Sequence, residues 1–427
     1  MEKVDVLLGL QWGDEGKGKV VDVLTPHYDL VARFQGGPNA GHTLEFDNKK
    51  YVLRSIPSGI FQGGKYNVIG NGVVLDPLLF REEAEALAQS GIDLRERLLI
   101  SKKAHLILPT HRLLDAAYEA RKGDAKIGTT GKGIGPTYTD KVSRNGLRVG
   151  DVLLDFQAKY AKAKQHHVQL LQDMGMLTDF SDLEQRWLEA IDYLRQYQLI
   201  DSEYYINKAL DEQKKVLAEG AQGSLLDLDF GSYPFVTSSN TISAGCCTGL
   251  GVAPLRIGRV FGIFKAYCTR VGAGPFPTEL HDEIGEEIGR KGAEFGAVTG
   301  RKRRCGWLDL VALKYTVMLN GVTDLIMMKS DVLSNLDEIK VCTHYELNGE
   351  LTQQVPYEMT PEVKPIYKTF EGWHEDMTHY TQESDFSANF ISYVTFIEEY
   401  LGVPVRILSV GPDRAQTIVR KGWNMNS

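Results

Sequence analysis

The chain has 427 residues, 43% of them hydrophobic and 24% charged, which is the composition of a globular protein large enough for one large core or two ordinary ones. Its formal net charge of −8 argues against a nucleic-acid coat or a membrane-surface protein, because both need a basic face. The five cysteines form no C-x-x-C pair, no apolar run reaches the length of a membrane span, and no signal peptide is recognisable. We therefore expect a cytoplasmic protein without disulfides or structural zinc.

The first strand and the first helix flank a glycine-rich loop. Val4–Leu8 is a nearly continuous apolar run typical of a buried parallel strand, and Lys17–Leu24 has a helical pattern. Between them, Gly9–Gly18 brings backbone N–H groups to a helix N-terminus, where they can bind phosphate. The loop is longer than a Walker A motif and lacks its final Ser or Thr. An ordinary strand-to-helix turn is the alternative, but Asp14 and Lys17 in this loop favour a phosphate site.

A second glycine-rich loop, Gln35–Thr43, directly follows the predicted strand Leu30–Phe34. It therefore lies at the carboxyl end of a strand, where ligands bind in α/β proteins. His42 is the one histidine that stands in such a loop. A lone histidine is more often structural than catalytic, so a role for His42 depends on its neighbours.

Strands and helices alternate along the rest of the chain, which predicts a doubly wound α/β fold with a large, mostly parallel central sheet flanked by helices. The segment 151–211 is richer in charge and in helical pattern, and we expect it to be a helical insertion within a single domain spanning 1–427. The further predicted strands are Leu98–Ile100, Leu106–Leu108, Val216–Ala218, Val260–Ala266, Leu325–Met328 and Val405–Val410. The further predicted helices are Asp76–Gln89, with Asp76 as its N-cap, His111–Lys122, Asp182–Gln198, Leu310–Leu319 and Phe386–Leu401.

Two motifs together, QWGDEGKGK at residues 11–19 and GGPNAGHT at residues 36–43, resemble the signature of the adenylosuccinate synthetase family. The resemblance covers nearly the whole chain and is weaker in the helical segment 151–211. Further matching segments are 127–151, 219–227, 233–241, 269–280, 300–309 and 409–414. Small departures occur at Pro38, Lys132, Lys302 and Cys305, and none of them removes a residue to which we assign chemistry.

The resemblance implies a carbon–nitrogen ligase that joins L-aspartate to inosine monophosphate (IMP) and converts GTP to GDP and phosphate. Its product would be adenylosuccinate, which makes this the first committed step from IMP to AMP in purine nucleotide biosynthesis. The purine 6-oxo group is a poor leaving group. Phosphorylation of O6 would give 6-phosphoryl-IMP, from which the amine of aspartate can displace phosphate. The resemblance also implies Mg²⁺ as cofactor and a homodimer.

Five residues of the two loops and of a later turn would carry this chemistry. Asp14 would be the general base that takes the N1 proton of IMP, and it would ligate Mg²⁺ together with the Gly41 carbonyl. His42 would act as the acid, and Lys17 would neutralise charge on the γ-phosphoryl group. Gln222 would hold the purine O6. A charge that only complements the helix dipole is the alternative for Asp14, and a plain turn residue is the alternative for Gln222.

Two polar segments would choose the triphosphate and bind the amino acid. Asp331 follows a buried strand, and its carboxylate can accept from the paired N–H donors of guanine, which adenine lacks. Lys329 can lie along the ring. The basic run Thr299–Arg304 is either a solvated surface or a loop that clamps a dicarboxylate through arginine forks.

The resemblance implies the following complete sets of contacts. Those with IMP are Asp14, Glu15, Gly16, Lys17, Asn39, Ala40, Gly41, His42, Thr130, Arg144, Gln222, Thr237 and Arg301. Those with aspartate are Val271, Val298, Thr299, Arg301 and Arg303. Those with GTP are Gly13, Asp14, Glu15, Gly16, Lys17, Gly18, Lys19, Gly41, His42, Thr43, Arg303, Lys329, Ser330, Asp331, Ser409, Val410 and Gly411. Arg144 would reach IMP from the neighbouring subunit of the homodimer.

Two rival functions use the same phosphate loop. A nucleotide kinase would transfer phosphate without needing aspartate, and a non-catalytic GTP-binding switch would leave Asp14 and His42 without a role. We expect no nucleic-acid or membrane partner. The remaining candidate metal ligands, His105, His111 and the pair His166-His167, lack a zinc spacing and are interpreted as structural or surface residues.

Overall fold

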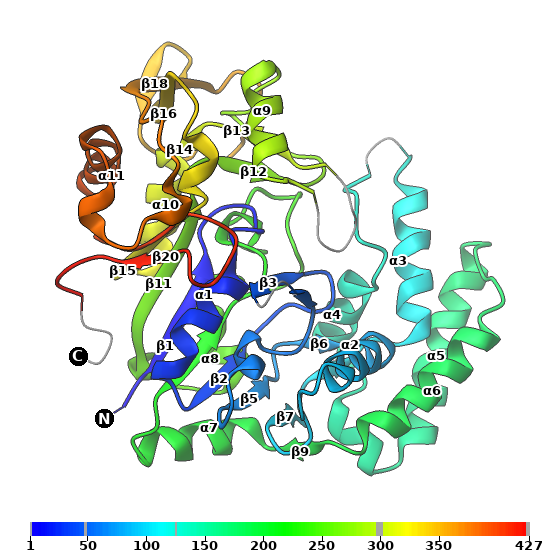
Figure 1. Ribbon diagram of the computed structural model, residues 1–427. Coiled ribbons are helices and arrows are strands. Elements are labelled where there is room, and N and C mark those ends of the chain that lie inside the picture. The colour runs from blue at the N-terminus through cyan, green and yellow to red at the C-terminus, as the bar shows by residue number, and fades with distance from the viewer. Residues whose placement is uncertain (1, 47–48, 124–125, 296–301, 424–427) are drawn as a thin grey trace.

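The computed structural model describes residues 2–46, 49–123, 126–295 and 302–423. A ten-stranded sheet runs through the molecule in the order β20-β19-β15-β11-β1-β10-β2-β5-β7-β9 (Figure 1). Neighbouring strands are parallel except at one edge, where β20 runs antiparallel to β19. The strands are β1 (Val4–Gly9), β2 (Leu30–Arg33), β5 (Tyr66–Ile69), β7 (Leu98–Ser101), β9 (Gln198–Ile200), β10 (Val216–Glu219), β11 (Ile257–Lys265), β15 (Asp324–Met328), β19 (Val405–Ser409) and β20 (Thr417–Val419). The predicted α/β architecture is confirmed.

Burial on both faces explains why the central strands read as continuous apolar runs. In β1, Val6 pairs with Ala218 of β10 on one side and with Val260 of β11 on the other. These side chains are at most 4% exposed. A strand covered by helices on both faces has no solvent side on which polar residues could alternate. Strand β5 was not predicted, because it is short and contains the polar residue Asn67.

Helices pack on both sides of the sheet and extend beyond it (Figure 1). The helices α2, α5 and α6 gather beyond β7, and α10 and α11 lie toward the opposite end. The helices are α1 (Lys17–Leu24), α2 (Pro77–Gln89), α3 (Pro109–Arg121), α4 (Ile134–Ser143), α5 (Phe156–Asp173), α6 (Ser181–Leu194), α7 (Ser202–Asp211), α8 (Ala244–Leu250), α9 (Glu283–Lys291), α10 (Leu310–Asn320) and α11 (Ala388–Leu401). The predicted N-cap of α2 is confirmed, because Asp76 accepts hydrogen bonds from the N–H groups of Leu78 and Leu79 at 3.0 and 3.4 Å.

Smaller sheets frame the carboxyl edge of the large one. They pair β12 (Cys268–Arg270) with β13 (Arg304–Gly306), β3 (His42–Phe46) with β4 (Lys49–Leu53), and β6 (Val74–Leu75) with β8 (His105–Leu106). A further sheet joins β14 (Leu308–Asp309), β16 (Glu338–Leu347), β17 (Glu350–Thr352) and β18 (Lys364–Glu371). The predicted strand Leu106–Leu108 is therefore wrong in extent, since β8 ends at Leu106 and lies outside the central sheet.

The predicted helix Asp182–Gln198 is wrong at its C-terminus. Helix α6 ends at Leu194, and Gln198 begins the edge strand β9, which pairs with β7. The end of the helix was predicted too late because buried apolar residues continue from the helix into the turn that follows it, up to Tyr197. The segment 151–211 is mainly helical, with α5, α6 and α7, but it also completes the central sheet.

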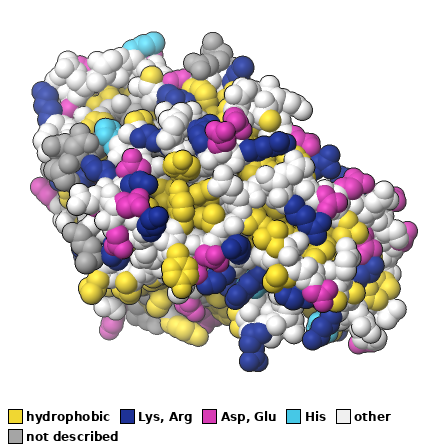
Figure 2. All heavy atoms as spheres, turned by 90° about the horizontal axis from the view of Figure 1, so that it is seen from below, with side chains coloured by type: hydrophobic (Ala, Val, Ile, Leu, Met, Phe, Trp, Pro, Cys, Tyr) yellow, Lys and Arg dark blue, Asp and Glu magenta, His cyan; other side chains and the backbone are white. Residues whose placement is uncertain are grey.

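The surface mixes charge types. On the face shown in Figure 2, hydrophobic side chains gather in the middle, and both basic and acidic groups lie among and around them. Among the described residues, no helix combines the length and the apolar character needed to cross a membrane.

Candidate active site

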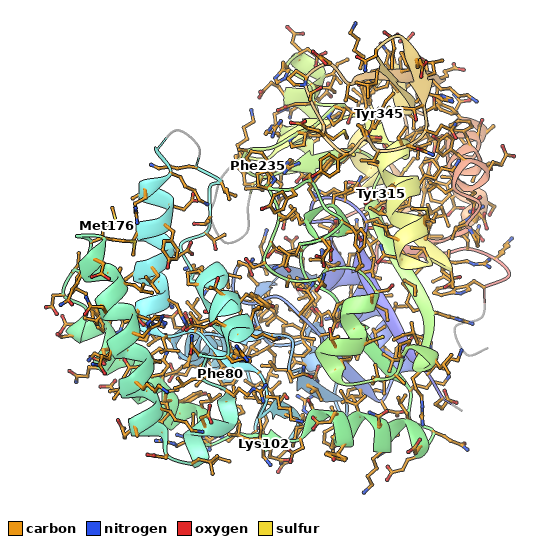
Figure 3. The ribbon with its side chains drawn as sticks, turned by 180° about the vertical axis from the view of Figure 1, so that it is seen from behind. Phe80, Lys102, Met176, Phe235, Tyr315 and Tyr345 are labelled. Carbon is orange, nitrogen blue, oxygen red and sulfur yellow. The ribbon has the colours of Figure 1, made fainter. Side chains whose placement is uncertain are left out.

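A cleft of about 1080 Å³ opens at the carboxyl ends of the central strands. The loops after β1, β2, β10, β15 and β19 all reach it, as expected for a parallel α/β sheet. Phe235 also lines the cleft and lies between the helical part that carries Met176 and the part that carries Tyr345 (Figure 3). The predicted site residues that line the cleft are Gly13, Asp14, Glu15, Gly16, Lys17, Gly18, Lys19, Asn39, Ala40, Gly41, His42, Thr43, Thr130, Gln222, Thr237, Val271, Arg303, Lys329, Asp331, Ser409 and Gly411. The fold thus brings together residues that are almost 400 positions apart in the chain.

A few predicted site residues do not line the cleft. Ser330 and Val410 are buried beside lining residues. Arg144 is exposed in a left-handed conformation (φ 66°) at the C-cap of α4. The predicted aspartate-binding residues Val298, Thr299 and Arg301 lie outside the described residues.

Glu15 organises the phosphate loop from within. Its buried carboxylate accepts from the N–H groups of Gln11 and Gly13 at 3.1 and 2.9 Å, and from Lys17 Nζ at 2.6 Å. A Cβ on Gly9 would lie 2.2 Å from Glu15 Oε2, so only glycine leaves room for this side chain. Gly16 precedes α1 in a left-handed conformation without a side-chain cap, which leaves the first N–H groups of the helix for an anion.

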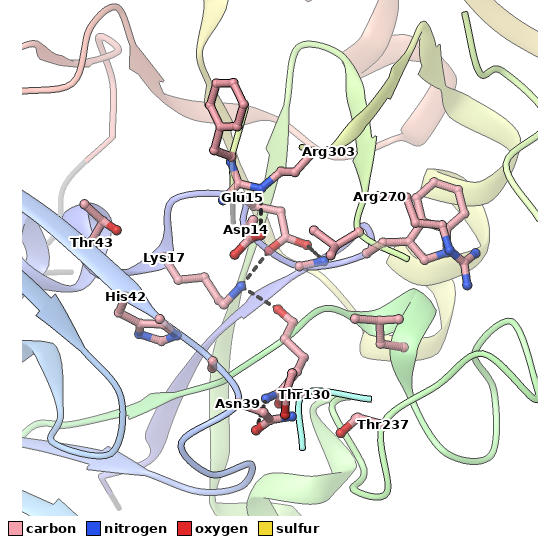
Figure 4. Close-up of a pocket in the computed structure, with 18 of the residues that line it drawn as sticks. Asp14, Glu15, Lys17, Asn39, His42, Thr43, Thr130, Thr237, Arg270 and Arg303 are labelled. Atoms are coloured by element: carbon pink, nitrogen blue, oxygen red, sulfur yellow. Dashed lines mark hydrogen bonds and ion pairs between the residues drawn. The ribbon is translucent and has the colours of Figure 1, made fainter. Parts of the chain in front are cut away.

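Lys17 and Lys19 differ in their surroundings. Lys17 Nζ donates to the carbonyl of Gln222 at 2.5 Å and stands inside the cleft (Figure 4). Lys19 Nζ instead donates to Ser409 Oγ and to the carbonyl of Gly411, both at 2.8 Å. Burial lowers the pKa of Lys19 to about 8, and the carboxylates of Asp331 and Asp413 oppose this shift. Lys19 therefore fastens α1 to the loop after β19.

His42 forms a dyad with Glu219, the last residue of β10. Its Nδ1 lies 2.5 Å from Glu219 Oε1, and Ser58 donates to the same carboxylate through its Oγ at 2.6 Å and its N–H at 2.8 Å. The guanidinium of Arg33 lies 3.8 Å from Glu219 Oε1. Burial alone would raise the pKa of Glu219, but these partners lower it, and the net effect is a lowered pKa. The carboxylate is therefore ionised, and His42 Nδ1 carries the proton that is donated to it.

The other ring nitrogen of His42 is left for a ligand. Nε2 is buried and has no hydrogen-bond partner among the described residues. Burial lowers the pKa of His42 to about 4, Arg33 and Lys17 add to this effect, and Glu219 opposes it. Without a ligand the imidazole is therefore neutral at pH 7, and Nε2 is an acceptor.

Asp14, Gln222 and Asn39 line the cleft. Figure 4 shows Asp14 and Asn39 there. Asp14 and Gln222 both have positive φ angles, 58° and 57°, in tight loops that follow strands. Gln222 Nε2 donates to Asn39 Oδ1 at 3.0 Å, while its Oε1 is buried without a partner among the described residues. Asp14 Oδ2 accepts from Arg303 Nε at 2.8 Å.

The residues predicted to bind guanine, Lys329 and Asp331, line the same cleft. Burial raises the pKa of Asp331, and its Oδ1 has no hydrogen-bond partner within the described chain. Lys329 precedes it with φ 59° and donates to Glu294 Oε1 at 2.9 Å. A buried carboxylate oxygen without a donor costs free energy, which a ligand N–H would recover.

Within the basic run, only Arg303 of the described residues lines the cleft. Lys302 pairs with Glu286 at 2.5 Å, and Arg304 donates to Glu279 at 2.7 Å. Of the described residues of this basic run, Arg303 therefore lines the cleft, whereas Lys302 and Arg304 pair with carboxylates outside the cleft.

His111, Asp140 and His167 form a buried group whose ligand atoms lie close enough for a metal. Asp140 Oδ2 lies 2.9 Å from His111 Nε2 and 2.8 Å from His167 Nε2. However, the backbone N–H of Leu108 donates to His111 Nδ1 at 3.0 Å, so the proton of this ring is on Nε2 and points to Asp140. These hydrogen bonds connect α3, α4 and α5.

Sequence reasoning missed Glu219, Glu294 and Arg270. Arg270 is buried in the lining, 5.3 Å from the ring of Trp12, and donates to backbone carbonyls of the loop that follows β12. Glu219 did carry a signal, since it is a charged residue that ends an apolar strand directly before a glycine turn. Glu294 carried none, because its burial depends on Lys265, Arg303 and Lys329, which only the tertiary fold brings to it.

Comparisons with known proteins agree with this geometry. The family model described as adenylosuccinate synthetase matches residues 6–418. The chain is 70% identical to the adenylosuccinate synthetase of Parabacteroides distasonis over 98% of this chain and 99% of that protein, and 69% identical to that of Porphyromonas gingivalis over 99% and 100%. The fully ligated adenylosuccinate synthetase of Plasmodium falciparum superposes with a TM-score of 0.93 at 38% identity, covering 98% of this chain and all of that one. A cyanophage succinoaminodeoxyadenylate synthetase shares the fold at a TM-score of 0.63 and 19% identity.

Proposed function

Since the chain belongs to the adenylosuccinate synthetase family, it is a GTP-dependent ligase that joins L-aspartate to IMP in AMP biosynthesis, and we propose how its cleft carries out this reaction. The observation that carries the proposal is the placement of Asp14, His42 and Gln222 in one cleft. The phosphate loop and Asp331 line the same cleft, and Asp331 Oδ1 is buried without a hydrogen-bond partner among the described residues.

The first step is phosphoryl transfer from GTP to O6 of IMP. Asp14 takes the N1 proton, O6 becomes nucleophilic, and it attacks the γ-phosphorus while the bond to the β–γ bridging oxygen breaks. Lys17 and the free N–H groups at the start of α1 hold the negative charge of the moving phosphoryl group. Gln222 holds the purine, supported by its hydrogen bond to Asn39.

Asp14 has to leave Arg303 before it can act as a base. In the ion pair, Arg303 Nε occupies Asp14 Oδ2 at 2.8 Å, so this oxygen and this N–H are not free for a substrate. When nucleotides bind, their phosphates compete for Arg303, and the freed Asp14 faces IMP. Binding of GTP is therefore what activates the base.

His42 acts as an acid only after it gains a proton. Its Nδ1–H is committed to Glu219, so Nε2 can donate to a phosphoryl oxygen only as part of an imidazolium. The negative charge of a bound γ-phosphate raises the pKa of a nearby imidazole. His42 would thus take up a proton when GTP binds and use it to stabilise charge during transfer.

In the second step the amine of aspartate attacks C6 of 6-phosphoryl-IMP, and phosphate leaves with the former O6. Arg303 and Val271 line the cleft where aspartate would bind. Val298, Thr299 and Arg301, which lie outside the described residues, are included by resemblance. Bidentate pairing of arginine with carboxylates suits a dicarboxylic substrate.

Mg²⁺ would be held by the Asp14 carboxylate and the Gly41 carbonyl. Both groups are oxygen donors that line the same cleft, and oxygen is the donor that this hard cation prefers. When bound, the ion would neutralise charge on the triphosphate. Asp14 is 29% exposed, so it is accessible to a hydrated cation.

A homodimer would complete the IMP site. Arg144 is exposed together with Val142, whose exposure is 81%, on the end of α4 that points away from this cleft's lining residues. An exposed arginine beside an exposed apolar side chain suits an interface with a second copy. We place the protein in the cytoplasm, which fits its five unpaired cysteines. The chain is proposed to act as one domain, 1–427, with 151–211 as a helical insertion.

A turnover assay tests the function. Purified protein is mixed with IMP, GTP and Mg²⁺, with and without aspartate, and both the purine absorbance and GDP are followed. A shift in absorbance with GDP formed only in the presence of aspartate is expected. Equal GDP formation without aspartate would indicate a kinase or a GTPase.

A further inference from the structure

We propose that Glu294 is a positioning residue that sets the places of two cations of the GTP site, Lys329 and Arg303. The inference rests on the GTP-binding roles proposed above for these two residues. It concerns a residue that follows α9 and that does not itself line the cleft.

The Glu294 carboxylate is completely buried and is shared among groups from separate parts of the chain. Its Oε1 accepts from Lys329 Nζ at 2.9 Å and from the hydroxyl of Tyr267. Its Oε2 accepts from Arg303 Nη1 at 2.5 Å, and Lys265 Nζ lies 3.1 Å from both oxygens. One carboxylate thus joins the loop after β15, the residue before β13 and the central strand β11.

The charge balance makes this carboxylate hard to replace. Burial alone would raise the pKa of Glu294, but Lys265, Lys329 and Arg303 together lower it below its ordinary range. Lys265, Lys329 and Arg303 therefore all pair with the buried Glu294 carboxylate. Arg303 also pairs with a second carboxylate, that of Asp14. Without the Glu294 charge, the three cations would repel one another and move apart.

The contacts of Arg303 are divided between two edges of its guanidinium. Nε donates to Asp14, whereas Nη1 donates to Glu294. Because these nitrogens are separate donors in a rigid plane, Arg303 can exchange Asp14 for a phosphate oxygen without releasing Glu294. Arg303 would then keep its contact with Glu294 while its contact with Asp14 is replaced by one with a phosphate oxygen.

Lys329, which also lines the cleft, is held by the same carboxylate. Its Nζ donates to Glu294 and also to the carbonyl of Gly292 at 2.5 Å. This directs the aliphatic stem of Lys329 along the lining, where the guanine ring would lie. Glu294 therefore connects Lys329, which would contact the guanine base, with Arg303, which would bind the phosphates.

A purely structural role is the rival explanation, in which Glu294 serves only as the counter-ion of the buried Lys265. Lys265 is fully buried, and burial lowers its pKa to about 8. It also donates to Thr269 Oγ1 at 2.6 Å, and it does not line the cleft. Removing Lys265 together with Glu294 therefore separates the two roles.

The test measures dissociation constants for GTP and for IMP separately, by titration calorimetry, with wild type, Glu294→Gln, Lys265→Met and the double variant. Loss of a charged hydrogen bond to each of two ligand-binding cations is expected to weaken GTP binding about tenfold to a hundredfold in Glu294→Gln, with IMP binding changed by less than about twofold. Since removal of a whole buried ion pair is tolerated better than removal of one partner, the double variant should fold even if Glu294→Gln does not. It should still bind GTP weakly.

Wild-type affinity for GTP in the folded double variant, as judged by an unchanged melting temperature, would overturn the proposal and leave Glu294 as a counter-ion. An equal loss of GTP and IMP affinity would also overturn it. These outcomes are separate from failure of the proposed function. That failure would appear as a wild-type protein that forms no adenylosuccinate, whatever the variants bind.

Discussion

His42 Nδ1 lies 2.5 Å from Glu219 Oε1, and this contact joins the first residue of β3 to the last residue of β10. The two strands belong to different sheets, so the dyad depends on the loop after β2 folding back over the central sheet. A histidine that donates through Nδ1 presents Nε2 in one fixed direction, here toward the cleft. The same carboxylate both orients the ring and supports its positive charge.

Replacing Glu219 by Gln should lower kcat about a hundredfold while the KM values for GTP and IMP change little, because an amide cannot stabilise the imidazolium. Steady-state kinetics with each substrate varied will measure this. Ser58→Ala is the matched control, since it removes a neutral hydrogen bond to the same carboxylate and should have a small effect. If Glu219→Gln were to raise KM with unchanged kcat, Glu219 would serve substrate binding rather than His42.

GTP binding should take up a proton at His42. In the ligand-free protein the pKa of His42 is lowered to about 4, below its ordinary value of 6.5, so the ring is neutral at pH 6. A bound phosphate anion raises this pKa, so the proton is taken up between pH 4 and the new, higher pKa. Calorimetry of GTP binding at pH 6, in buffers with different ionisation enthalpies, should give net uptake that disappears in His42→Asn. Uptake of equal size in that variant would place the proton elsewhere.

Asp331→Asn should weaken GTP binding about tenfold to a hundredfold, because the amide cannot accept hydrogen bonds from both donors of the guanine edge. Binding of IMP should change little, since Asp331 is not among the residues expected to contact IMP. Dissociation constants for both nucleotides provide the comparison. Equal losses for GTP and IMP would show that Asp331 supports the fold of the cleft rather than reading guanine.

Mixing two inactive variants should restore activity if Arg144 acts across a dimer. Asp14→Asn removes the base, and Arg144→Leu removes the arginine supplied to the neighbour. A mixed dimer has one site with both residues intact, so random exchange of equal amounts should recover about a quarter of wild-type activity. Co-expression with two affinity tags isolates the mixed dimer. Its complete inactivity would mean that Arg144 serves the site of its own subunit, and an active Arg144→Leu variant would mean that it serves none.

The sequence predicted those parts of the fold that depend on local pattern. Buried strands such as Val4–Gly9 are nearly continuous apolar runs, and Asp76 with Pro77 marks a helix start through side-chain capping and the fixed φ of proline. The boundary between α6 and β9 was missed, because an edge strand that completes a sheet is defined by its partner and not by its own residues.

The candidate site was predictable where a glycine-rich loop follows a strand, as with Asp14, Lys17 and His42. The buried anions that orient them were not. Glu294 is explained only by three cations brought to it by the tertiary fold, and Lys19 belongs to a phosphate motif but fastens the loop after β19. Ion pairs over long sequence distances leave no mark in residue spacing.

The central claim is that O6 of IMP is phosphorylated and then leaves with the phosphate. IMP labelled with ¹⁸O at position 6 tests this directly, by mass analysis of the phosphate released in the presence of GTP, Mg²⁺ and aspartate. The mechanism predicts one ¹⁸O atom in each phosphate formed, and no labelled phosphate from the Asp14→Asn variant. Unlabelled phosphate from the wild-type protein would mean that water, not IMP, receives the γ-phosphoryl group, and it would contradict the proposed mechanism.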